Sequence, residues 1–256
     1  MINLGTSDER IRKLIKRDYD KNYIVVDDLF VLSLEKCKYS KIKFCLMCEE
    51  LIKSDEAKSL ADFYMQKCDC YAISKKVFER IASKDNLAGI IVYTKIEEVS
   101  LEKFKKFSKI LICDGIEISG NIGTIFRTAD ATQIDAIIFT NLKAKVFDEK
   151  VVHSSRGMIF EVPFIVLNFD ETTKLLQKNN ITPVVCEPEQ GVDYRNFEYC
   201  DKLAFVVGSE RYGSDKRWFE QKPVKYLKIG MDGIMTSLNV GVAASLIMYE
   251  IKHKKN

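Results

Sequence analysis

Residues 205–215 read Phe-Val-Val-Gly-Ser-Glu-Arg-Tyr-Gly-Ser-Asp. An apolar run that starts at Leu203 ends at Gly208, and an acid, Glu210, and a second glycine, Gly213, follow it. A short apolar run bounded by glycine is typical of a buried strand. Ligands of open α/β sheets bind beyond the carboxyl ends of the strands, so the pattern places Glu210 at a candidate ligand site. The alternative is a plain strand-to-helix connection with surface charges.

The rest of the second half has the same pattern. A helix is expected over 122–132, and further helices between the later strands. Strands are expected over 109–114, 136–140, 164–167, 182–186 and 203–208. Continuous apolar strands that alternate with helices predict a parallel sheet covered on both faces.

The first half reads as a smaller α/β unit. Its strand-like segments are 23–26, 43–48 and 89–93, and helices are expected after a capping Ser7 and over 28–37, 55–67 and 74–83. Residues 95–108 are charged and lack a strong apolar period. The sequence therefore predicts a domain over 1–95, a linker over 96–108 and a second domain over 109–256.

Composition narrows the class of protein. The 256 residues carry a net charge of +3, from 40 basic and 37 acidic side chains. No apolar run reaches the ~18 residues of a membrane span, and no secretory signal opens the chain. We therefore expect a cytoplasmic protein without a membrane partner, whose eight cysteines are small apolar residues rather than disulfides.

Two local clusters could still carry specialised chemistry. Lys36, Lys38, Lys41 and Lys43 fall within eight residues without an acid, and nucleic-acid binding would need such clustering because the net charge is small. A solvated surface is the alternative. Cys45, Cys48, Cys68 and Cys70 have the spacing of zinc ligands, but they interrupt strand-like patterns and no glycine turn flanks them, so no metal is expected.

Two further glycine-containing segments accompany the opening stretch. In Gly120-Asn-Ile-Gly-Thr-Ile-Phe-Arg, Arg127 comes one helical turn after Gly123, so its guanidinium can lie over the glycine opening. The segment lacks the lysine and hydroxyl of a phosphate loop. In Ser237-Leu-Asn-Val, Ser237 or Asn239 can serve a helix N-terminus, and the following Gly-Val-Ala-Ala-Ser permits close packing.

Together and in this order, the three segments resemble the SpoU (TrmH) family of RNA 2′-O-ribose methyltransferases, over residues 108–252. Residues 114–123 and 155–163 look like the thiostrepton/nosiheptide-resistance branch, whose members methylate an adenosine ribose of large-subunit (23S) rRNA. The first half is similar, more loosely, to the small ribosomal-protein-like RNA-binding domain of that branch. Gly120 and Gly230 stand where many members have proline, and Gln133 where glycine is common.

The resemblance implies a trefoil-knotted methyltransferase domain that binds S-adenosylmethionine and works as a homodimer. Its cofactor residues would be Cys186, Gly208, Ser209, Glu210, Gly213, Ile229 and Leu238. Its catalytic residues would be Arg127, Glu210, Ser237 and Asn239. Its RNA contacts would be Asn121, Arg127, Arg156, Lys36, Lys38 and Lys41. An arginine stays protonated, so Arg127 is expected to bind phosphate and stabilise a developing alkoxide.

Two alternatives remain open at this level. The same chemistry could act on transfer RNA, although a separate RNA-binding domain favours folded ribosomal RNA. The chain could also be an RNA-binding or ribosome-assembly factor without activity. The joint presence of Asn121, Arg127, Glu210, Ser237 and Asn239 argues against a degenerate site.

Overall fold

The computed structural model describes residues 1–18, 20–34, 38–83, 88–199 and 202–254. Within these, the contacts divide the chain into two compact units. The first comprises Met1–Glu97 and Phe147–Glu161, and the second Glu98–Val146 and Val162–Asn256. The segment Phe147–Glu161, which the sequence assigned to the second domain, thus packs with the first unit.

The first unit is built on a five-stranded mixed sheet in the order β1-β4-β3-β5-β2. Its strands are β1 (Ile2–Asn3), β2 (Tyr23–Val26), β3 (Ser40–Met47), β4 (Cys70–Ala72) and β5 (Ile90–Ile96). Its helices are α1 (Glu9–Lys16), α2 (Leu29–Leu32), α3 (Asp55–Lys67), α4 (Lys75–Ile81) and α6 (Glu149–Ser155), and η2 (Met158–Phe160) is a short 3-10 turn. Apolar side chains of α1, α4 and β3, with Ile11, Phe78 and Leu46 among them, form its buried core.

Two local expectations for the first unit need correction. Asp8, not Ser7, caps α1, because its carboxylate accepts the backbone N–H of Arg10. The helix expected over 28–37 is shorter: α2 begins after Asp28, whose side chain accepts the N–H of Val31, and ends at Leu32. Residues 35–37 lie outside the described part of the chain.

The second unit holds a seven-stranded sheet, parallel throughout, in the order β10-β12-β9-β11-β6-β7-β8. Its strands are β6 (Lys109–Asp114), β7 (Ala136–Thr140), β8 (Phe164–Leu167), β9 (Thr182–Cys186), β10 (Val192–Asp193), β11 (Leu203–Val207) and β12 (Lys225–Lys228). The parallel α/β sheet predicted from the apolar runs is confirmed. The sequence pattern did not indicate β10 and β12, which are short and carry charged residues.

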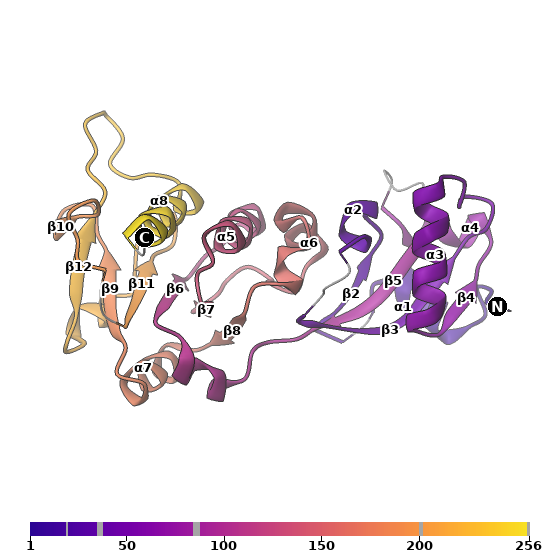
Figure 1. Cartoon of the computed structure of the whole chain (residues 1–256), viewed down its shortest axis with the longest axis horizontal. Coiled ribbons are helices and arrows are strands. Elements are labelled where there is room, and N and C mark those ends of the chain that lie inside the picture. Colours follow the sequence, from indigo (N-terminus) through magenta and orange to yellow (C-terminus); the bar gives the residue numbers. More distant parts are fainter. Residues whose placement is uncertain (19, 35–37, 84–87, 200–201, 255–256) are drawn as a thin grey trace. The chain divides into compact units, whose positions relative to one another are not determined.

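Helices lie on both faces of this sheet. Figure 1 shows α5 (Ser119–Thr132) beside α8 (Val240–Lys254) on one face and α7 (Phe169–Lys178) on the other. The hydroxyl groups of Thr128 and Ser245 are hydrogen-bonded at 2.9 Å across the α5–α8 contact. A Cβ on Gly241 would come within 3.4 Å of Thr124, so the small-residue helix does pack closely, as predicted. In the described residues, no helix is both long and apolar enough to cross a membrane.

The segment expected to be a linker is largely part of the second unit. It forms the 3-10 turn η1 (Leu101–Lys106), and a second such turn, η3 (Lys216–Glu220), follows β11. Phe104 is fully buried in η1 and meets Phe107 edge-to-face, with ring centroids 5.1 Å apart. Lys109 is also buried, and its ammonium group donates to the carbonyl of Tyr199. The charged segment expected to be a linker therefore belongs, from Glu98 onward, to the packed second unit.

Candidate functional site

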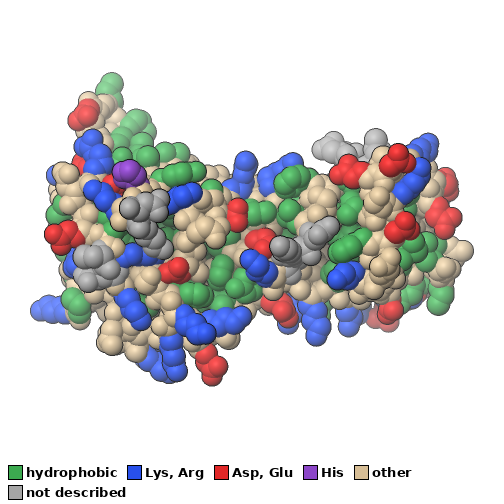
Figure 2. Space-filling model, viewed as in Figure 1, with side chains coloured by type: hydrophobic (Ala, Val, Ile, Leu, Met, Phe, Trp, Pro, Cys, Tyr) green, Lys and Arg blue, Asp and Glu red, His purple; other side chains and the backbone are tan. Residues whose placement is uncertain are grey.

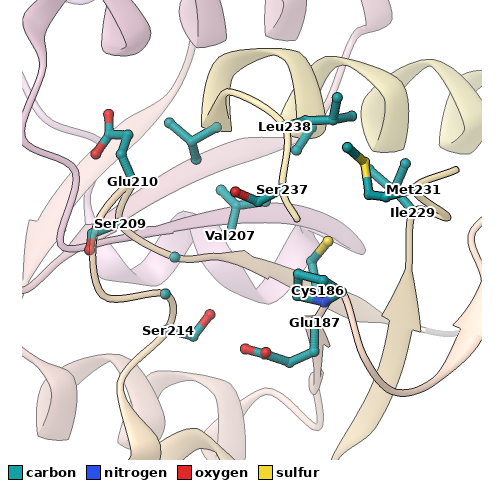
Figure 3. Close-up of a pocket in the computed structure, with 15 residues that line it drawn as sticks. Cys186, Glu187, Val207, Ser209, Glu210, Ser214, Ile229, Met231, Ser237 and Leu238 are labelled. Atoms are coloured by element: carbon teal, nitrogen blue, oxygen red, sulfur yellow. The ribbon is translucent and has the colours of Figure 1, made fainter. Parts of the chain in front are cut away.

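One pocket of the second unit gathers the glycine-containing segments. It comprises about 670 Å³ of space, part of which is open solvent. The residues that line it follow the carboxyl ends of β9, β11 and β12 or open α8 (Figure 3). They are Cys186, Glu187, Pro188, Val207, Gly208, Ser209, Glu210, Gly213, Ser214, Ile229, Met231, Ser237, Leu238, Val240 and Ala243.

All seven residues expected to hold a cofactor line this pocket. They come from three separate stretches, at 186, 208–213 and 229–238. The parallel strand order explains the meeting, since β11 pairs with β9 and β9 with β12, so the three carboxyl ends share one edge. Figure 3 shows Cys186, Ser237 and the Ile229–Met231 stretch around the same opening.

The turn after β11 is tight because glycine permits it. A Cβ on Gly208 would lie 2.1 Å from the carbonyl carbon of Gly213 and 2.2 Å from the backbone nitrogen of Ser214. Ser209 and Gly213 exchange two backbone hydrogen bonds, at 2.9 and 3.1 Å. Gly213 adopts φ +68°, a conformation that side chains with a Cβ disfavour. Larger residues at 208 would push apart the chain segments that form this wall.

A polar network joins the three motifs at the side of the pocket. The Asn121 amide donates to Glu210 Oε1, and the Asn239 amide donates to Asn121 Oδ1 at 3.1 Å. Asn239 Oδ1 accepts the backbone N–H of Gly241 at 2.9 Å, so this side chain also caps α8. The expectation that Asn239 serves a helix N-terminus is confirmed, and Asn121 joins it to Glu210.

Two side chains of the β9 end set the electrostatics of the opposite wall. Burial, reinforced by the neighbouring Glu187, raises the pKa of the Cys186 thiol to about 12. Burial also raises the pKa of Glu187, with Glu189 as a second cause. Cys186 therefore stays a neutral thiol at physiological pH and provides apolar surface.

Arg127 and Ser237 differ in their placement. Arg127 is exposed on α5, two turns beyond Asn121, and is not among the residues that line the pocket. Ser237 lines the pocket from the exposed segment that precedes α8. The structure thus brings Glu210, Ser237 and Asn239 to the pocket or its polar border, and leaves Arg127 on the surface of the helix that supplies Asn121.

Apart from Arg127, the basic residues expected to contact RNA belong to the first unit. Lys41 is exposed on β3, and Lys38 lies 3.5 Å from Glu161. The Arg156 guanidinium lies 4.5 Å above the ring of Phe30 and 3.8 Å from the carboxylate of Asp28. Lys36 lies outside the described residues. None of the described basic residues of this set lines the pocket.

Sequence reasoning gave no role to Asp114, whose hydrogen bonds hold the chain segment next to the pocket. It is buried at the end of β6 and accepts hydrogen bonds from the Asn141 amide at 2.7 Å, the Asp215 N–H at 2.7 Å and the Trp218 indole at 2.9 Å. These contacts fix the chain just after the Gly208–Gly213 turn. The available signal was an acid directly following an apolar strand.

Comparisons with known proteins show the family of this chain. Residues 108–249 match the SpoU rRNA Methylase family. A Staphylococcus aureus (strain MSSA476) protein assigned to the TrmH family of tRNA/rRNA methyltransferases is 34% identical over 199 residues, which is 75% of this chain and 80% of that protein. A Staphylococcus saprophyticus protein of the same assignment is 38% identical over 152 residues, or 59% of this chain and 61% of that protein.

Solved structures share the fold. The SpoU methyltransferase AviRb from Streptomyces viridochromogenes, in complex with AdoMet, aligns with a TM-score of 0.85 at 20% identity over 97% of this chain and 98% of that one. An AdoMet-bound rRNA methyltransferase from Sinorhizobium meliloti aligns with a TM-score of 0.83 at 18% identity over 99% and 98%. By the family match and the sequence relatives, the chain belongs to the SpoU/TrmH family of RNA methyltransferases.

Proposed function

We propose that this protein transfers a methyl group from S-adenosylmethionine to a ribose 2′-hydroxyl of RNA, with large-subunit rRNA as its target. The main support is that Glu210, Asn121 and Asn239, which come from three distant segments, are joined by hydrogen bonds at the border of the pocket. All seven expected cofactor residues line the same pocket. If this network served only to cap α8, Asn239 alone would be sufficient, and neither Asn121 nor Glu210 would be needed.

The pocket fits the chemistry of the cofactor. S-adenosylmethionine combines an apolar base with hydroxyl, ammonium, carboxylate and sulfonium groups, and supplies the methyl group from its sulfonium. Ile229, Leu238 and Val207 contribute apolar surface to the lining, and Ser209, Glu210 and Ser214 contribute polar groups. Glu210 Oε2 and Ser214 Oγ are buried and find no hydrogen-bond partner among the described residues, so the pocket offers polar atoms to a ligand. Such unmatched buried groups are costly unless a ligand or water satisfies them.

The chain's own groups would position and activate the ribose. A 2′-hydroxyl is a weak nucleophile, and alignment together with stabilisation of the developing alkoxide lowers the barrier. Arg127 is assigned to this role and to binding the adjacent phosphate, because its guanidinium remains charged and offers several donors. Asn121 and Asn239 keep Glu210 oriented, and Ser237 contacts the nucleotide.

The proposal also covers the chain path, the oligomeric state, the target nucleotide, the biological role and the location of the protein. The segment after β12 and the Gly208–Gly213 turn line one pocket, and the resemblance to the family extends the proposal to a trefoil-knotted chain path. Side chains of this segment and of α8 are exposed although apolar, which supports a homodimer that covers them. The exposed residues are Ile234 and Met235 of the segment and Val242 and Tyr249 of α8. The resemblance to the resistance branch extends the proposal to a 23S rRNA adenosine, to thiopeptide resistance and to a cytoplasmic location.

The test combines binding with transfer. Calorimetry measures S-adenosylmethionine binding to the purified chain, and tritium transfer is measured on rRNA and tRNA isolated from cells that lack the protein. We expect transfer to large-subunit rRNA and a 2′-O-methylated nucleotide after digestion. Transfer only to tRNA would establish the first alternative, whereas RNA binding without cofactor binding would establish a non-catalytic factor. Light scattering of the same sample measures the dimer.

A further inference from the structure

A second hollow lies entirely within the first unit. It is formed by α1, the residues that follow α1, and one face of the five-stranded sheet, and it spans about 1260 Å³ of space that opens to solvent. The residues that line it are Arg10, Lys13, Leu14, Asp18, Asp20, Tyr23, Lys43, Phe44, Asp69, Tyr71 and Tyr93.

A row of four aromatic rings crosses the sheet along this hollow. Tyr71 on β4 meets Phe44 on β3 edge-to-face at 6.0 Å, Phe44 meets Tyr93 on β5 at 5.1 Å, and Tyr93 stacks on Tyr23 of β2 at 5.2 Å. Phe44 is buried, whereas the three tyrosines are partly exposed. The partly exposed tyrosines therefore present aromatic surface to the hollow, while Phe44 packs in the core.

A β-bulge adds a cation to the same surface. The pairing of β3 with β5 shifts between Ile42 and Phe44, so Lys43 is an extra residue opposite β5. Strict alternation would turn Lys43 away from the face that carries Phe44, whereas both residues line the hollow. Bulges re-aim side chains in this way and are common beside functional sites.

The charges at the hollow favour a ligand of mixed character. Arg10 lies 4.2 Å above the ring of Tyr71, and Lys13 and Lys43 stand nearby. Arg10 is ion-paired with Asp8 and Lys13 with Glu9, each at 2.9 Å. Asp18, Asp20 and Asp69 also line the hollow, so a bare phosphate gains little net attraction. Carboxylates do accept hydrogen bonds from the amino groups of nucleobases, and aromatic rings stack on bases of any sequence.

We propose that this hollow binds an unpaired nucleobase of RNA, with the base against the tyrosine row and its phosphate beside Lys43. The inference rests on the proposed function, since it gives the first unit a specific part in holding the RNA substrate. Sequence-specific and structured RNA recognition commonly uses unstacked bases that lie on aromatic side chains. The site would act separately from the pocket of the second unit.

Fluorescence anisotropy of the full-length protein tests the proposal with two probes. One is a labelled single-stranded oligoadenylate, and the other is an abasic ribose-phosphate oligomer of equal length and charge. Tyr23→Leu should weaken oligoadenylate binding about tenfold, the effect of one lost stacking contact, and leave abasic binding unchanged. Tyr23→Phe should restore it. Lys43→Gln should weaken both probes, while Lys53→Gln, an exposed lysine before α3, should change neither.

Circular dichroism verifies the fold of each variant, and Tyr71→Leu tests the other end of the row should Tyr23→Leu unfold. A folded leucine variant that binds oligoadenylate within twofold of wild type overturns the proposal. If the wild type methylates RNA in that case, only the base site fails. If the wild type transfers no methyl group but the Tyr23 dependence holds, the enzymatic function fails and the base site stands.

Discussion

The amide of Asn239 donates a hydrogen bond to Asn121 Oδ1 at 3.1 Å, although 118 residues separate the two along the chain. The same Asn239 caps α8 through Gly241, and the same Asn121 donates to Glu210. Two asparagines thus couple the start of the last helix to the acid that follows β11. Substitution can separate the two roles of Asn239, because its Oδ1 caps α8 and its amide nitrogen donates to Asn121.

Asn239→Ala should cost stability and Asn239→Asp should not. Alanine removes the cap, which is worth about 1 kcal/mol, whereas aspartate retains the oxygen that accepts the Gly241 N–H. Both variants lose the donor to Asn121, so both should lose methyl transfer. Thermal unfolding and transfer from labelled S-adenosylmethionine report the two effects. Full activity in a folded Asn239→Asp variant would show that the Asn121 contact is dispensable.

Arg127→Ala should lower methyl transfer about 100-fold or more, the range found when one donor to a developing oxyanion is removed. Its exposed position on α5 predicts an unchanged melting temperature and unchanged cofactor affinity. Turnover is compared with that of Arg80→Ala, an exposed arginine of α4 in the first unit. Near-normal turnover of Arg127→Ala would remove this residue from the mechanism.

Gly208→Ala should disrupt the pocket, because the added Cβ would lie 2.1–2.5 Å from backbone atoms of Gly213 and Ser214. Backbone cannot yield as a flexible side chain does, so a loss of about 3 kcal/mol in unfolding free energy is expected. Gly233→Ala is the matched control, since a Cβ there meets nothing within 4 Å. Denaturant titration and calorimetric cofactor binding compare the pair. Equal stability of the two variants would contradict the tight crossing.

Cys70 should be half ionised near neutral pH. A hydrogen bond from the Cys45 thiol, followed by one from Cys68, lowers the Cys70 pKa to about 7 against the opposing effect of burial. The thiolate reacts with iodoacetamide and the thiol does not, so alkylation of Cys70 should rise with pH through a midpoint near that value. Peptide mass spectrometry follows the reaction.

Cys45→Ala removes the principal donor and should move the Cys70 midpoint to higher pH. The free thiols of Cys48 and Cys113 serve as internal references, because burial raises the pKa of each. A midpoint that does not move in the Cys45→Ala variant would exclude the proposed cause.

The sequence by itself determined the family and much of the second unit. The glycine-containing segments around Asn121, Glu210 and Asn239 stand in a fixed order, and the apolar runs that precede them are strongly patterned. Helix and strand periodicity is a local property of the chain, so β6, β7, β8, β9 and α3 fall within the residues predicted for them. The resemblance to the family also named seven cofactor candidates, and the structure brings them to one pocket because the carboxyl ends of parallel strands meet at one edge of the sheet.

Only the tertiary structure decided the remainder, where long-range pairing overrides local pattern. The charged segment β12 is a strand because it pairs with β9. Lys109 is buried because its ammonium group donates a hydrogen bond to the Tyr199 carbonyl. The bulge at Lys43 exists only in relation to β5, so no alternation of residues along β3 could reveal it. Hydrogen-bond partners far apart in sequence fix these features, and their free energy is gained only once the sheet has assembled.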